Sequence, residues 1–95
     1  NEMCADTVIK DFVIEGSNGV CSPLSIEILK GERSKLTFKA VGNMYMLVIP
    51  GLEINWMLSD GESKEQVIQL DKPGKYSFEC GTHGGTQSKG EIIVK

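Results

Sequence analysis

Hydrophobic and polar residues alternate along much of this chain with a period of two, whereas a helix would repeat every 3.6 residues. In the segment SKLTFKAV, the side chains of Leu36, Phe38 and Ala40 point to one side, and lysine and threonine side chains point to the other. The segments KYSFEC (75–80) and GEIIVK (90–95) repeat the pattern. Such alternation is typical of strands with one buried face, so we expect a strand in each segment.

Five further segments alternate less regularly, and turn-forming residues such as those in EGSNG, SDGES and DKPGK separate them. About eight short strands at this spacing predict an all-β sandwich or barrel that occupies residues 1–95 as a single domain. No segment carries a helical stripe. The five weaker strand segments are Thr7–Glu15, Leu24–Leu29, Asn43–Pro50, Ile54–Leu58 and Glu65–Leu70.

Charge and hydropathy exclude several classes of partner. The 95 residues carry 10 basic and 13 acidic side chains, for a formal charge of -3, and the basic residues form no run. Phosphate binding needs concentrated lysine and arginine, so we expect no nucleic-acid partner. No stretch is long and apolar enough to cross a bilayer, so we expect no membrane insertion in this segment.

The chain has three cysteines, Cys4, Cys21 and Cys80. An odd number leaves at least one thiol outside any intramolecular disulfide. Our interpretation pairs Cys4 with Cys21, which flank one expected strand, and leaves Cys80 for chemistry. The alternative is that all three are reduced and partly buried, because spacing alone fixes neither the connectivity nor the redox compartment.

Cys80 and His83 form the main candidate site. Cys80 ends an alternating strand, so its sulfur should point into one end of the sandwich, and His83 follows in a glycine-rich loop. A thiolate and an imidazole together favour copper or zinc. As a bare pattern C-x-x-H is weak, because a lone loop histidine is more often simply solvated. A cysteine nucleophile would need an orienting acid, and the nearby Glu79 lies on the opposite face, so we expect no enzyme.

At this point the sequence resembles the cupredoxins, a family of Greek-key β-sandwich copper proteins. The resemblance covers nearly the whole chain and rests on SPLSIEILKGERSKLTFKAVG, YMLVIPGLEI, DKPGKYSFEC and CGTHGGTQSKGEIIV. The last segment matches the plastocyanin-type ligand loop without a gap. The resemblance implies that Cys80 is the thiolate ligand and His83 the second imidazole, and it places Ser88 where the family has its axial methionine.

Two departures from the family pattern change the ligand set. Tyr45 stands where the family has its first histidine, and His83 is the only histidine in the chain, so a site with two histidines and one cysteine cannot be built from this chain alone. Met44 or Met46 could supply a thioether, Tyr45 a phenolate, or Gln87 a weak axial oxygen. We favour a methionine, although both methionines point away from the site if Tyr45 faces it.

The resemblance thus implies one copper ion per chain, held by Cys80 and His83 with Met44 and Tyr45 as the candidates to complete the site. The implied role is copper handling or electron transfer in a periplasmic or extracellular location, with a redox or copper-delivery protein as partner. Two alternatives stay open. One is a metal-free interaction domain, in which the methionines only fill the core. The other is a thiol-redox module that uses Cys80.

Overall fold

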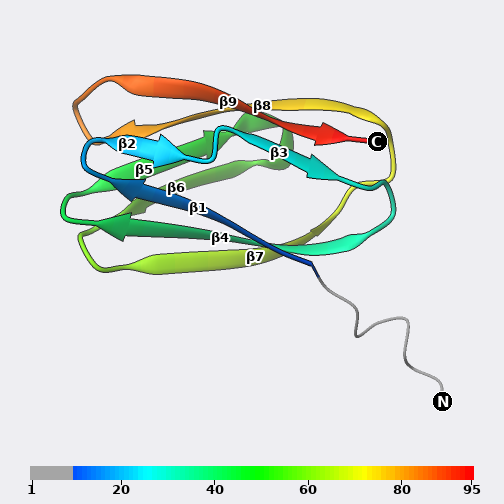
Figure 1. The fold of residues 1–95 in the computed structure, drawn as a ribbon, viewed down its shortest axis with the longest axis horizontal. Coiled ribbons are helices and arrows are strands. Elements are labelled where there is room, and N and C mark those ends of the chain that lie inside the picture. Colours follow the sequence, from blue (N-terminus) through cyan, green and yellow to red (C-terminus); the bar gives the residue numbers. More distant parts are fainter. Residues whose placement is uncertain (1–9) are drawn as a thin grey trace, which may run out of the picture.

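The chain folds into two β-sheets packed face to face, as seen in a computed structural model that describes residues 10–95. Nine strands make up the two layers within this range (Figure 1). The strands are β1 Lys10–Ser17, β2 Val20–Ser22, β3 Ser25–Ile28, β4 Arg33–Val41, β5 Tyr45–Ile49, β6 Ile54–Leu58, β7 Ser63–Gln69, β8 Gly74–Thr82 and β9 Gln87–Val94.

Both sheets are mixed. The four-stranded sheet has the order β2-β1-β4-β7, and the five-stranded sheet has the order β3-β9-β8-β5-β6. The pairs β1–β4 and β3–β9 are parallel, and the other neighbouring strands are antiparallel. The expected all-β sandwich is therefore confirmed. Among the described residues the only helical element is a three-residue 3-10 turn, Pro50–Leu52, so no helix there is long enough to cross a membrane.

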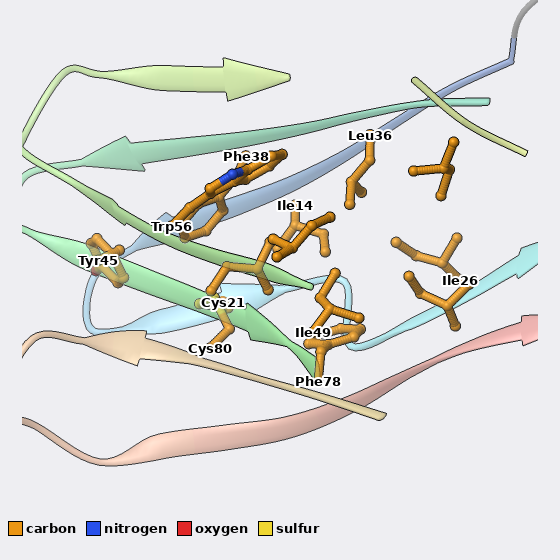
Figure 2. Close-up of a cluster of buried hydrophobic side chains, with 14 of the residues drawn as sticks. Ile14, Cys21, Ile26, Leu36, Phe38, Tyr45, Ile49, Trp56, Phe78 and Cys80 are labelled. Atoms are coloured by element: carbon orange, nitrogen blue, oxygen red, sulfur yellow. A yellow bond between two sulfur atoms is a disulfide. The ribbon is translucent and has the colours of Figure 1, made fainter. Parts of the chain in front are cut away.

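The core lies between the sheets and is built by the inward side of each alternating strand. Leu36, Phe38 and Ala40 of β4 are buried, as the alternation predicts, and so are Phe78 of β8 and Ile92 of β9. Figure 2 shows large side chains from both sheets meeting in this layer. Because each strand contributes alternate residues to the core, its intervening residues lie on the outer face of the sheet.

Strand β2 was not predicted. It forms a short antiparallel hairpin with β1, in which Ser17 pairs with Val20 across the turn at Asn18 and Gly19. Both turn residues have positive φ angles, 55° and 83°, which is the conformation that an Asn-Gly pair favours in a tight hairpin. After β2 the chain leaves the four-stranded sheet and enters the five-stranded sheet as β3.

Four connections gather at one end of the sandwich, on the left in Figure 1. They link β1 to β2, β4 to β5, β6 to β7 and β8 to β9. This end, called the loop end below, carries the residues that the sequence singled out as candidate ligands. The C-terminus lies at the opposite end.

Candidate functional site

Cys80 is joined to Cys21 by a disulfide. Cys21 comes from β2 and Cys80 from β8, so the bond links the two sheets, with 6.1 Å between the Cα atoms and 59 residues of sequence separation. Figure 2 shows the two side chains pointing toward one another across the core. Their exposed fractions are 4% and 0%, so neither is available to solvent.

The predicted Cys4–Cys21 pairing is therefore wrong, and Cys4 itself lies outside the described residues. The pairing is set by the way in which the two sheets pack. Strand β2 lies at the edge of one sheet and faces β8 of the other, and the spacing of cysteines along the chain cannot show this contact. In this disulfide state Cys80 offers no thiolate to a metal, because only the thiolate is the ligand.

Tyr45 occupies the inner face of β5 at the loop end. Its side chain is fully buried, and its hydroxyl accepts a 2.7 Å hydrogen bond from the backbone N–H of Gly19 in the β1–β2 turn. Gly16 of β1 lies so close to the Tyr45 ring that a Cβ atom at Gly16 would overlap it. Tyr45 thus packs against the β1–β2 hairpin and anchors its turn.

His83 lies at the tip of the β8–β9 connection, and its side chain is exposed. The backbone N–H of Gly85 donates to the carbonyl oxygen of Thr82 over 3.1 Å, and the backbone N–H of His83 donates to the carbonyl oxygen of Met44 over 3.0 Å. The side-chain amide of Gln87 donates to the carbonyl oxygens of Thr82 and Gly85 over 2.7 Å and 3.2 Å. Gln87 therefore holds the turn closed.

The structure divides the predicted ligands between two sides of the five-stranded sheet. Cys80 and Tyr45 are fully buried on its inner side. Met44 is only partly buried, and it lies beside His83 at the loop end. Ser88, the residue that the resemblance placed at the axial position, stands opposite Cys80 in the β8–β9 register and is partly buried.

A blue-copper centre does not fit this arrangement. Cys80 is held in a disulfide, Tyr45 is buried with its hydroxyl hydrogen-bonded, and His83 is exposed at a turn. Within residues 10–95, no three histidine, cysteine, aspartate or glutamate side chains converge as a metal site would require. Sequence reasoning missed Cys21 as the partner of Cys80 because Cys21 lies on the unrecognised strand β2, to which only the Asn18–Gly19 hairpin signal could have pointed.

Comparison with known families gives one match. The family model described as a cupredoxin-like domain matches residues 5–94. No curated protein matches the chain.

Solved structures with the same fold include three copper proteins. The metal-binding domain of the Cu(I)-exporting P-type ATPase CopA of Streptococcus pneumoniae, determined with Cu(I), is 20% identical with a TM-score of 0.74, over 100% of this chain and 91% of that one. A heme-copper terminal oxidase chain is 21% identical (TM-score 0.73, 90% of this chain and 65% of that one). The blue copper protein auracyanin A of Chloroflexus aurantiacus is 15% identical (TM-score 0.67, 93% and 100%). At these identities the likeness concerns the fold.

Proposed function

Because this chain belongs to the cupredoxin-like domain family, we propose that it is a copper-handling domain that binds Cu(I) through the sulfur atoms of Cys21 and Cys80 once their disulfide is reduced. The observation that carries the proposal is the position of this sulfur pair. It includes the cysteine that aligns with the thiolate ligand of the family, and it brings a second sulfur to the same point between the sheets.

Two thiolates are a ligand set for a soft ion. Soft sulfur ligands select Cu(I) over hard cations, and a pair of adjacent thiolates needs no imidazole. Reduction of the disulfide consumes two electrons and two protons, which a dithiol protein supplies while its own pair becomes a disulfide. Binding of Cu(I) then releases the thiol protons, because the ligands coordinate as thiolates. In this role copper is cargo, which the domain captures and passes on.

Electron transfer through a blue-copper centre has less support. That centre needs two imidazoles beside the thiolate, and this chain has one histidine. Tyr45 is buried and hydrogen-bonded within the fold. If its hydroxyl became a metal ligand, both its packing and its hydrogen bond would be lost. Copper handling therefore agrees better with the residues at the loop end.

The same bond supports a periplasmic or extracellular location as part of the proposal. Disulfides persist in oxidising compartments and are rare in reducing ones. In such a compartment the Cys21–Cys80 pair would take up copper only after a partner dithiol reduced it. The proposed partners are therefore a dithiol reductant and a protein that donates or accepts Cu(I).

The test is anaerobic titration of the reduced protein with Cu(I) in competition with a chromogenic chelator. We expect the reduced wild-type protein to bind one more Cu(I) per chain than the Cys21→Ser/Cys80→Ser variant. A Cys4→Ser variant is the matched control and should bind as the wild-type protein does. Equal Cu(I) binding by the reduced wild-type protein and the double variant would exclude the sulfur pair as the site.

A second candidate function is a metal-free interaction domain on the same scaffold. Two observations favour it. The Cys21–Cys80 disulfide joins the two sheets, and Tyr45 holds the β1–β2 hairpin. The disulfide and Tyr45 therefore stabilise the fold from inner positions that a copper site would otherwise use. The fold would then need no metal. This candidate predicts that neither the disulfide form nor the reduced form takes Cu(I) or Cu(II) from the chelator.

A further inference from the structure

Two methionines face each other on the outer side of the five-stranded sheet. Met46 of β5 and Met57 of β6 are directly paired in the antiparallel register. Their neighbours along each strand, such as Leu47 and Trp56, are buried in the core, so strand alternation places both methionines outside. Met57 is 51% exposed, and Met46 is partly buried.

A third methionine and the histidine lie next to this pair. Met44 lies immediately before β5, two residues from Met46, and its carbonyl oxygen continues the ladder to β8, so alternation extended by one position places both methionines on the same side. The β5–β8 ladder pairs Tyr45 with Thr82, and the hydrogen bond from the His83 N–H to the Met44 carbonyl oxygen extends it by one position. His83 therefore lies across from Met44, at the loop end and exposed to solvent.

We propose that Met44, Met46, Met57 and His83, which we call the methionine cluster, bind one Cu(I) ion on the outer face of the sheet. Directly opposed residues of a sheet have Cβ atoms about 5 Å apart, and diagonal neighbours are about 7–8 Å apart; these values cover every cross-strand pair of the cluster except Met57 and His83. Those two lie on opposite sides of β5, roughly 12 Å apart, so their side chains would reach the ion from opposite directions. Methionine has three rotatable bonds and a polarisable sulfur, so side chains at these separations can turn their sulfur atoms toward one ion. Thioether and imidazole ligands together suit Cu(I) and exclude hard cations.

The methionine cluster is separate from the sulfur pair of the proposed function. Cys80 is buried on the inner side of the same sheet, whereas the methionine cluster lies on the outer side. A thioether carries no proton to lose and is not consumed when a disulfide forms. The methionine cluster is therefore competent in the disulfide form of the protein, in which Cys21 and Cys80 cannot bind a metal.

The usual explanation for methionine in a sandwich, that it fills the core, does not account for these residues. Core filling needs burial, and half of the Met57 side chain is in contact with solvent. A single exposed apolar residue would need no explanation. In this protein, however, three methionines and the only histidine of the chain occupy neighbouring positions on three adjacent strands, at one end of one sheet.

The experiment uses the Cys4→Ser protein, which has no cysteine outside the Cys21–Cys80 disulfide, with that bond intact and with carbon-13 at the methionine methyl groups. Cu(I) stabilised in acetonitrile is added anaerobically without thiol, and a competing chelator reports the affinity. We expect one Cu(I) per chain and shifts of the Met44, Met46 and Met57 methyl signals. Met3, which lies outside the described residues and outside the methionine cluster, provides the internal control.

Variants locate the ligands. Met57→Leu, Met46→Leu and His83→Gln should each weaken Cu(I) binding by about tenfold or more, as expected when one of a few ligands is lost. Leucine keeps the volume and the hydrophobic character, so the fold should persist. The Met44→Leu/Met46→Leu/Met57→Leu variant should leave Cu(I) with the chelator, and Met3→Leu should bind as the wild-type protein does.

Three results would overturn the proposal. One is a disulfide form that takes no Cu(I), another is Cu(I) binding that survives the triple variant, and the third is a methyl shift confined to Met3. Because the measurement is made on the disulfide form, its failure leaves the sulfur pair untouched. Conversely, loss of the extra ion in the reduced Cys21→Ser/Cys80→Ser variant says nothing against the methionine cluster.

Discussion

The inner and outer faces of the five-stranded sheet carry different side chains at the loop end, and these side chains have different roles. On the inner side, Tyr45 is fully buried, its hydroxyl is hydrogen-bonded to the β1–β2 turn, and the nearby Cys80 is bonded to the opposite sheet. On the outer side, Met46 and Met57 pair without being buried completely. The inner residues hold the fold together, whereas the outer residues leave sulfur atoms available to a ligand.

This difference shows where a cupredoxin-like domain can place soft donor atoms outside its core. A fold with an inward cysteine can use that sulfur for a covalent bond between the sheets and still present soft donors on the opposite face of the same sheet. Strand alternation makes the two sets independent, because neighbouring residues point to opposite sides. The comparison predicts that inner substitutions change stability and outer substitutions change copper binding.

Removal of the disulfide should have the largest effect on stability. In the chain-entropy model, a bond that closes a loop of 59 residues stabilises a protein by about 4 kcal/mol. Cys21→Ser/Cys80→Ser should therefore lose about 4 kcal/mol of unfolding free energy in a urea titration under oxidising conditions. The matched control is Cys4→Ser. A double variant as stable as the wild-type protein would show that the bond contributes nothing to the fold.

Tyr45→Phe should have an intermediate effect. The substitution keeps the ring but removes the acceptor for the N–H of the exposed Gly19, which costs the net contribution of one hydrogen bond, about 1 kcal/mol. The control is Tyr76→Phe, at a partly buried tyrosine against the edge of the core. That change should alter the unfolding free energy by less than about 0.5 kcal/mol. Equal losses for the two variants would contradict an anchoring role for Tyr45.

Substitutions on the outer face should barely change stability. Met57→Leu removes no buried contact of consequence, because half of the side chain is exposed. We expect the unfolding free energy to change by less than about 0.5 kcal/mol while Cu(I) binding by the disulfide form is weakened. If Met57→Leu instead lost several kcal/mol with copper binding unchanged, the methionine would belong to the packing and the comparison of the two faces would fail.

Mild oxidation with peroxide should give the smallest structural change. Met57 is the more exposed member of the Met46–Met57 pair, so peptide mapping should find its sulfoxide first. A sulfoxide is polar and a poorer ligand for a soft ion, so the Cu(I) affinity of the disulfide form should fall as the Met57 sulfoxide accumulates. Met57→Leu protein should be insensitive to the same treatment. An affinity that stayed constant through complete oxidation of Met57 would remove it from the site.

Much of the fold followed from alternation. The segment INWML coincides with β6, and the inward set of β4 is the buried set that the pattern predicts. Strand β2 was not predicted because three residues are too few to show a period of two. Asn18–Gly19 is nevertheless a recognised hairpin signal that could have pointed to this strand. Alternation also indicated that Met44 and Met46 point away from the side that Tyr45 faces.

Less of the candidate site could be predicted from the sequence. The partner of Cys80 depends on which strand of the opposite sheet lies across from it, and Cys21 sits on the strand that the pattern missed. The pairing of Met46 with Met57 depends on the register of a hairpin, which the spacing of the two residues along the chain does not fix. The Cys21–Cys80 and Met46–Met57 pairs both depend on how the strands are arranged in the folded protein, so the sequence of the ligand loop alone could not reveal them.

Copper binding at two separate places is tested most directly by the Cu(I) stoichiometry of the Cys4→Ser protein, measured side by side with the Cys21–Cys80 disulfide intact and after its reduction. We predict one tightly bound Cu(I) per chain in the disulfide form, at the methionine cluster, and one more after reduction, at the sulfur pair. The same number of ions in both forms would contradict copper binding by the sulfur pair, and no ion in either form would indicate a metal-free scaffold.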